Sequence, residues 1–150
     1  MKDYIALWLE GLPKLHPSSL EFPVSATGVC ERHFGGHLAF AKITLRIEPA
    51  ASFEVVDDLP EDEEFRKGDY LDWAVFGLLD VLMFVECGPI SAIRVVVTEA
   101  EYSRVDSSQM AFRWAGRDAG KRIIESIKDI RQSKIRENPK LKEWTVKLSK

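Results

Sequence analysis

Small side chains recur along one face of the segment formed by residues 106–135. Two glycines, Gly116 and Gly120, lie beside a stripe with four-residue spacing, which consists of Ala111, Ala115, Ala119, Ile123 and Ile127. This spacing is typical of one face of an α-helix. Each glycine costs a helix about 1 kcal/mol relative to alanine, so we expect close packing against a neighbouring element to offset that cost. The stripe therefore predicts a helix that lies flush on a sheet or on another helix.

The hydrophobic pattern predicts the other elements. An apolar stripe that leaves Asp72 and Asp80 facing away predicts a helix over residues 70–87. Alternation or β-branched runs predict strands over residues 26–33, 40–47, 53–56, 90–98 and 142–148. Residues 4–12 are expected to form a short helix or an edge strand, and residues 57–67 an acidic loop. The predicted fold class is α+β, a two-layer sandwich in which about four strands carry two helices on one face.

The overall composition fits one cytoplasmic domain. The chain has 150 residues, of which 45% are hydrophobic, and its two cysteines offer no disulfide framework. It contains no apolar run long enough to span a bilayer and no secretory signal pattern at its start. We therefore expect no membrane partner.

Charge is distributed unevenly along the chain. Residues 1–112 hold 9 Lys and Arg against 19 Asp and Glu, a net charge of −10, whereas residues 113–150 hold 12 against 5, a net charge of +7. The cations of the second predicted helix include Arg113, Arg117, Lys121, Arg122, Lys128 and Arg131. Such a helix can present a phosphate-binding surface or simply a solvated face, and the charge pattern leaves both interpretations open.

Motifs for nucleotide binding and catalysis are missing from the sequence. It has neither a phosphate-binding loop of the form G-x-x-x-x-G-K-[S/T] nor a G-x-G-x-x-G fingerprint, so we expect no nucleotide and no cofactor. Cys30, His33 and His37 have a zinc-like spacing, but they are only three. We expect Cys30 in the core, the two histidines in a loop, and no metal. No candidate nucleophile accompanies the Asp and Glu side chains of the sequence, so the chain is not expected to be an enzyme.

A tight polar turn separates the strand at residues 90–98 from the second helix. The segment from Tyr102 to Phe112 reads YSRVDSSQMAF, and its Asp106 and Gln109 have the spacing of a capping box. Asp106, Ser107 and Ser108 can all accept hydrogen bonds from the first amides of a helix. We therefore expect a well-capped helix that starts near Asp106.

The same segment resembles the signature of the fourth domain of translation elongation factor G, roughly Y-H-x-V-D-S-S-E-M-A-F-K. Two further stretches are similar to that family: GGHLAFAKITLRIEP, which starts at Gly35, and NPKLKEWTVKL, which starts at Asn138. The resemblance covers about residues 22–148, so we expect one domain over residues 22–150 and an N-terminal extension over residues 1–21. It implies one copy of that domain standing alone, with the family's left-handed βαβ crossover instead of the usual right-handed one.

The resemblance also implies a site. In the family, two neighbouring loops form a tip that contacts tRNA and mRNA on the ribosome. The corresponding residues here are Gly35, Gly36, His37, Leu38, Ala39, Tyr102, Ser103 and Arg104. Several positions depart from the family: His37 replaces its arginine, Leu38 and Ala39 replace glycine and glutamine, and Ser103 replaces its histidine. A non-enzymatic ribosome- or RNA-binding role follows from the resemblance. The departures favour the alternative, a protein-interaction module or homo-oligomer that kept the fold alone.

Overall fold

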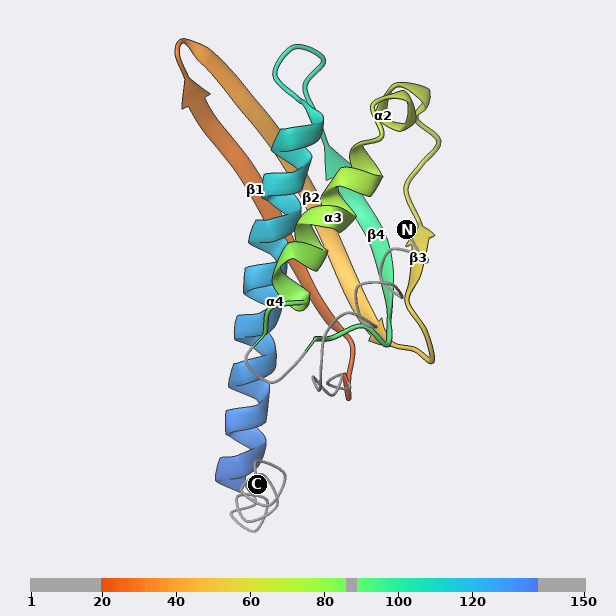
Figure 1. The fold of residues 1–150 in the computed structure, drawn as a ribbon, viewed down its shortest axis with the longest axis vertical. Helices are drawn as coiled ribbons and strands as arrows, with labels where there is room; N and C mark the ends of the chain where they lie inside the picture. Colours follow the sequence, from red (N-terminus) through yellow and green to blue (C-terminus); the bar gives the residue numbers. More distant parts are fainter. Residues whose placement is uncertain (1–19, 86–88, 138–150) are drawn as a thin grey trace.

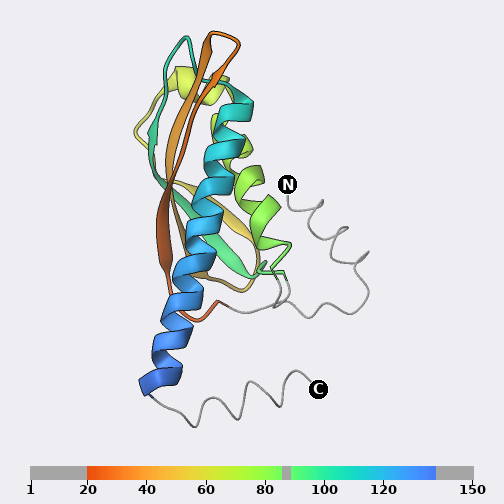
Figure 2. The same ribbon diagram turned by 90° about the vertical axis from the view of Figure 1, so that its left-hand side faces the viewer.

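Among the described residues, four strands form one sheet, and two long helices pack against one of its faces (Figures 1 and 2). The computed structural model describes residues 20–85 and 89–137. Its strands are β1 (Val24–Phe34), β2 (His37–Pro49), β3 (Glu54–Asp57) and β4 (Ile93–Glu101), and its helices are α2 (Glu63–Lys67), α3 (Tyr70–Leu82) and α4 (Gln109–Glu137). The predicted two-layer α+β fold is confirmed. No helix in these two ranges is long and apolar enough to cross a membrane.

The strands follow the order β1-β2-β4-β3 across the sheet. β1 pairs antiparallel with β2, and β2 with β4, whereas β3 and β4 are parallel and connected through α3. In Figure 1 both parallel strands run upward, α3 descends in front of the sheet, and β4 lies to the left of β3. That arrangement is a left-handed crossover, as the resemblance implied.

Alternation along the strands separates a dry face from a wet one. On β2, Ile43, Leu45 and Ile47 are fully buried beneath the helices, while Lys42 and Thr44 lie on the face that no described helix covers. The inward side chains meet Val95 and Val97 of β4 and the apolar stripe of α4 in one core. Burial of this continuous apolar layer is the main source of stability.

Glycine and alanine allow the two layers to approach closely. A Cβ added at Gly28 of β1 would clash with the backbone of α4 at Ala115 and Ala119. Between the two helices, a Cβ added at Gly116 would clash with the carbonyl of Ala74, and one added at Gly77 with that of Arg113. The packing predicted from the small-residue stripe is therefore confirmed.

Several local predictions were wrong. Helix α3 ends at Leu82 rather than near residue 87. Strand β4 starts at Ile93 rather than at Ile90. Ile90 is buried in the preceding loop, where its amide donates to Leu82 O at 3.0 Å. The acidic loop contains α2, since Asp62 accepts from the amides of Glu64 and Phe65 and so caps a short helix. The predicted elements at residues 4–12 and 142–148 lie outside the described ranges.

Candidate nucleic-acid interface

Two loops lie together at one end of the molecule (Figure 1). The first is the β1–β2 hairpin turn, where Gly35 and Gly36 adopt φ angles of 54° and 89° that favour glycine. The second connects β4 to α4. Their bases are joined by two hydrogen bonds at Phe40, whose amide donates to Asp106 O at 3.0 Å and whose carbonyl accepts from Ser107 Oγ at 2.6 Å. The structure therefore brings together the two segments that the resemblance assigned to the tip.

The second loop stabilises itself through its own side chains. Ser103 Oγ donates to the carboxylate of Asp106 at 3.0 Å and accepts from the Asp106 amide, while the Ser103 amide donates to Ser107 Oγ at 2.9 Å. Asp106 is thus occupied within the loop, and the predicted capping box with Gln109 is wrong. Ser108 caps α4 instead, because its Oγ accepts from the Ala111 amide at 3.2 Å.

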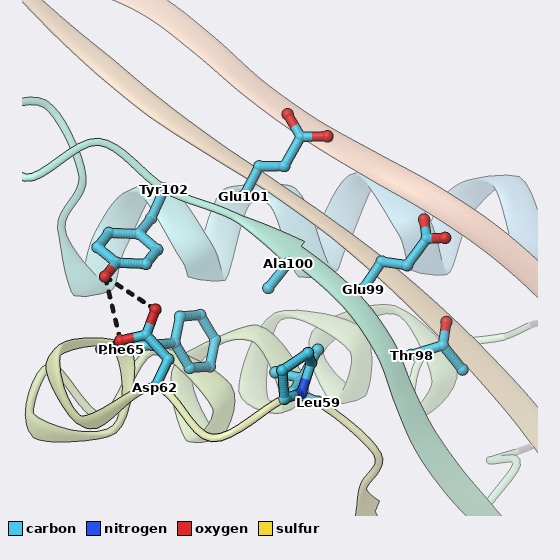
Figure 3. Close-up of a pocket in the computed structure, with 9 residues that line it drawn as sticks. Leu59, Asp62, Phe65, Thr98, Glu99, Ala100, Glu101 and Tyr102 are labelled. Atoms are coloured by element: carbon cyan, nitrogen blue, oxygen red, sulfur yellow. Dashed lines mark hydrogen bonds between the residues drawn. The ribbon is translucent and has the colours of Figure 1, made fainter.

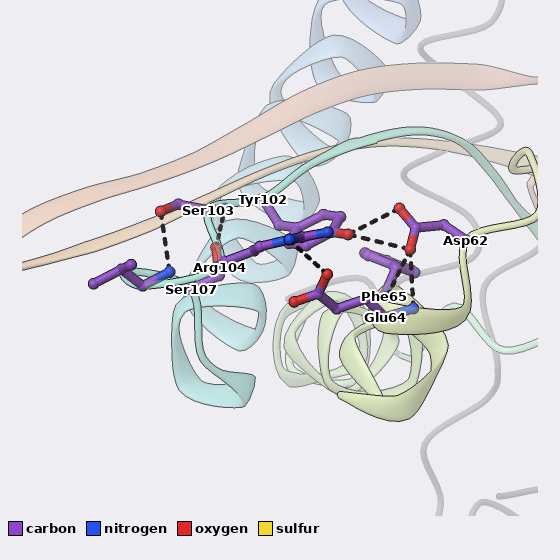
Figure 4. A network of polar contacts seen from close by, with 8 residues as sticks. Asp62, Glu64, Phe65, Tyr102, Ser103, Arg104 and Ser107 are labelled. Atoms are coloured by element: carbon purple, nitrogen blue, oxygen red, sulfur yellow. Dashed lines mark hydrogen bonds and ion pairs between the residues drawn. The ribbon is translucent and has the colours of Figure 1, made fainter.

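The remaining polar residues of the second loop contact the acidic segment around α2. Tyr102 donates its hydroxyl to both carboxylate oxygens of Asp62, at 3.1 and 3.0 Å (Figure 3). Arg104 pairs with Glu64 at 2.8 Å, although 80% of the arginine side chain remains exposed (Figure 4). Hydrogen bonds from the Phe65 amide and then from Tyr102 lower the pKa of the Asp62 carboxyl, and desolvation followed by the Asp62 hydrogen bond raises the pKa of Tyr102.

The six predicted cations of α4 occupy different environments. Arg113 makes two hydrogen bonds, of 2.9 and 3.0 Å, to the carboxylate of Asp80 on α3, and it also lies over the ring of Trp73. The Asp80 hydrogen bond raises the pKa of Arg113. Arg122 pairs within the helix with Asp118 at 3.0 Å. Lys128 and Arg131 follow toward the end of α4 that lies far from the tip (Figure 1).

Arg117 and Lys121, the two remaining cations, line a small cleft between α4 and the edge strand β1. The cleft has a volume of about 220 Å³, and its other lining residues are Val29, Arg32, Trp114 and Asp118. The Arg32 guanidinium lies 5.1 Å from the centre of the Trp114 ring, and the ring of Phe34, 49% exposed, lies 5.4 Å from it. We call Arg32, Phe34, Trp114, Arg117 and Lys121 the basic surface.

Sequence reasoning missed three members of the basic surface: Arg32, Phe34 and Trp114. Positions 114, 117 and 121 have helical spacing, so the sequence could have placed Trp114 beside the two cations. Arg32 and Phe34 lie 80 or more positions earlier in the chain than Trp114, and only the β1–α4 contact brings them there. Partly exposed aromatic rings among cations, such as Phe34 and Trp114, are typical of single-stranded nucleic-acid sites.

The zinc-like residues do not form a site. Cys30 is buried in the core with Sγ near Ala39 O, and burial raises the pKa of its thiol. His33 and His37 are both exposed on the hairpin. Within residues 20–85 and 89–137, no three His, Cys, Asp or Glu side chains lie close enough to hold a metal ion.

Comparison with known proteins points to one family. Elongation factor G of Thermotoga petrophila is 27% identical, with a match that covers 80% of this chain and 18% of the relative. The Petrotoga mobilis factor is 29% identical over the same shares, and the Dehalococcoides mccartyi factor is 33% identical over 70% of this chain and 16% of the relative. The chain is similar to one part of elongation factor G. The resemblance to the fourth domain of that factor is thereby confirmed.

These matches cover most of this chain but only a small part of each relative. The chain spans less than a fifth of the length of these relatives. A crystal structure from Thermus thermophilus superimposes with a TM-score of 0.61 at 23% identity, covering 76% of this chain and 17% of that one, which supports the same fold. No protein-family model matches the chain.

Proposed function

We propose that the chain is a non-enzymatic domain that binds RNA of the ribosome in connection with translation, and therefore acts in the cytoplasm. The similarity to elongation factor G supports the translational context. The observation that carries RNA binding is the basic surface, where Arg32, Arg117 and Lys121 gather around two partly exposed aromatic rings. This surface extends from α4 to the β1 residues just before the hairpin turn.

The chemistry of the basic surface suits unpaired nucleotides. Cations bind backbone phosphates and release counterions, while a base can stack on an aromatic face whatever its sequence. Asp118 is the acidic residue of the cleft, and its carboxylate already accepts from the Val29 amide at 3.1 Å and from Arg122 at 3.0 Å. Its charge is thus balanced within the protein, which leaves the three cations of the surface to face a ligand.

The tip adds a second area of contact. Gly35 and Gly36 have open space where a Cβ would lie, so a ligand can approach the backbone of the turn. Arg104 would exchange Glu64 for a phosphate. Exposed ion pairs are worth about 0–1 kcal/mol, so that exchange costs little.

Ribosome co-sedimentation over a salt series tests the proposal. The chain is expected to pellet with ribosomes at low salt and to be released as salt rises. The double variant Arg117→Ala/Lys121→Ala should bind about tenfold more weakly and show a salt slope smaller by roughly one to two units, given about 0.7–0.9 per phosphate contact. Arg66→Ala/Lys67→Ala makes the same change in charge on α2, outside the basic surface, and is expected to bind like the parent.

Three results would reject this function: no pelleting at low salt, binding independent of salt, or equal losses in the two double variants. A stable dimer without ribosome affinity, detected by analytical ultracentrifugation, would instead favour the protein-interaction module.

A further inference from the structure

A second hollow lies at the opposite edge of the sheet, between β4 and the segment that leads into α2. Its volume is about 460 Å³. We call it the acidic groove, and its lining residues are Leu59, Pro60, Asp62, Phe65, Thr98, Glu99, Ala100, Glu101 and Tyr102 (Figure 3). None of these residues belongs to the basic surface.

The groove follows a strand edge that no residue of the described ranges pairs with. β3 pairs with β4 only from Glu54 opposite Arg94 to Asp57 opposite Val97, and the Asp58 amide makes the last contact, to Val97 O at 3.1 Å. β4 continues to Glu101, paired with β2 alone among the described residues. Such an edge presents unpaired backbone donors and acceptors, which an added strand can satisfy.

The side chains along this edge alternate in chemistry. Glu99 and Glu101 project to the face of the sheet that no described helix covers, where they contact Thr44 at 3.1 Å and Lys42 at 2.6 Å. Ala100 between them turns toward the groove, whose apolar wall includes Leu59 and Phe65 (Figure 3). Both carboxylate side chains are exposed, so a cation on a neighbouring strand can reach Glu99, and at Glu101 it would compete with the ion pair to Lys42.

We infer that the acidic groove binds an extended peptide of a partner protein, added as a strand to the free edge of β4, in which basic and apolar residues alternate. The basic side chains would lie beside Glu99 and Glu101, because residues opposite one another on paired strands share a face. The apolar side chain between them would enter the groove beside Ala100. Charge complementarity thus selects the partner, and the period of two fixes its register.

The ends of the groove limit how the peptide enters. Asp58 occupies the plane of the sheet at one end, so the peptide must end or turn away there. At the other end the Tyr102–Asp62 contact closes the helix side of the groove. This contact is made by the hydroxyl of the inward-facing Tyr102 side chain, so it does not involve the backbone edge of β4.

NMR titration of the full chain with synthetic peptides tests the inference. A seven-residue peptide of alternating lysine and leucine, with capped termini, is compared with two capped controls. One control has all lysines before all leucines, and the other has glutamate in place of lysine. The alternating peptide is expected to shift the amide signals of residues 98–102 saturably and to slow their hydrogen exchange. The control with lysines and leucines in separate blocks should bind about tenfold more weakly, and the acidic control should not bind.

Matched variants complete the experiment. Glu99→Gln/Glu101→Gln should weaken binding of the alternating peptide about tenfold, whereas Glu31→Gln/Glu125→Gln, with the same change in charge elsewhere, should not. Ala100→Leu should also weaken binding, because its side chain would fill the apolar part of the groove.

Shifts spread over the whole surface, equal affinity for the alternating and block peptides, or equal losses in the two glutamine pairs would overturn the inference. Because these residues lie outside the basic surface, failure here leaves the ribosome experiment unaffected, and the reverse also holds.

Discussion

Two edges of one sheet carry opposite charge in this chain. The β1 edge, together with α4, presents Arg32, Arg117 and Lys121, while the upper β4 edge, together with α2, presents Asp62, Glu99 and Glu101. The net charge of −3 conceals this separation. The local distribution of charge, rather than its total, therefore indicates which kind of partner each edge can attract.

The two regions also differ in how they are built. The basic surface rests on a long helix pressed against β1 through Gly28, with backbone against backbone. The acidic groove rests on the five-residue helix α2, which Asp62 caps and Tyr102 links to β4. We therefore expect the basic surface to depend on the core, and the groove to depend on a few polar contacts.

The largest expected effect is that of Gly28→Val. The added side chain would meet the backbone of α4 at Ala115 and Ala119, so β1 and the helix must separate. We expect the free energy of unfolding to fall by about 3 kcal/mol, the upper part of the range for overpacked cores. Urea denaturation measures the change, and Ser25→Val, on an exposed position of the same strand, is the control. A loss no larger than that of Ser25→Val would show that the basic surface does not depend on this close contact.

A smaller effect separates two arginines of the same helix. Arg113→Ala removes the two hydrogen bonds to Asp80, and we expect it to cost about 1–2 kcal/mol of unfolding free energy while changing ribosome affinity by at most about twofold. Arg117→Ala should instead leave the unfolding free energy nearly unchanged and lower the ribosome affinity, since Arg117 is exposed and lines the cleft. Denaturation and co-sedimentation of both variants decide the matter. Equal losses of ribosome affinity in the two variants would mean that the cations of α4 contribute to binding regardless of their position on the helix.

The sequence predicted the architecture better than the site. The alanine stripe and the strand alternation are local periodic signals, and both correctly indicated which faces are buried, as at Ala115 and Ile43. The two loops of the predicted tip do lie side by side, joined at Phe40, and one contiguous motif from Tyr102 into α4 indicated the second of them, whereas their contact with RNA stays a prediction. The capping box failed because Asp106 is occupied by Ser103, a choice that depends on the geometry of the loop.

Long-range pairing accounts for the rest of what the sequence did not show. The cations of α4 look equivalent in the sequence, yet the position of α3 assigns Arg113 to Asp80 and leaves Arg117 to the cleft. The acidic segment before Lys67 reads as a solvated loop, and its groove arises only because β3 stops at Asp57 while β4 continues. Neither outcome has a local sequence signal.

Trp114→Ala tests the aromatic part of the basic surface. Loss of one stacking platform typically costs about 1–3 kcal/mol for each base, so we expect ribosome affinity to fall by at least about fivefold. Binding of the alternating peptide at the acidic groove should be unchanged. Trp73→Ala removes a tryptophan that contacts Arg113 and Phe76 outside the basic surface, and serves as the control in the same sedimentation assay. Equal losses in both variants would count against stacking at Trp114.

The smallest expected effect concerns the contact that closes the acidic groove. Tyr102→Phe removes the hydroxyl that donates to Asp62, and this donation helps to lower the pKa of the carboxyl. A carboxyl with a lowered pKa stabilises the fold above its unfolded-state pKa, and that contribution is lost as the pH falls through the lowered value. The parent chain should therefore be slightly more stable than the variant at neutral pH, and the two should converge in acid. Urea denaturation at pH 7 and pH 3 measures the difference, with Tyr70→Phe as the control for removal of a hydroxyl. A gap that stays constant with pH would show that the hydroxyl acts by packing rather than through the ionised Asp62.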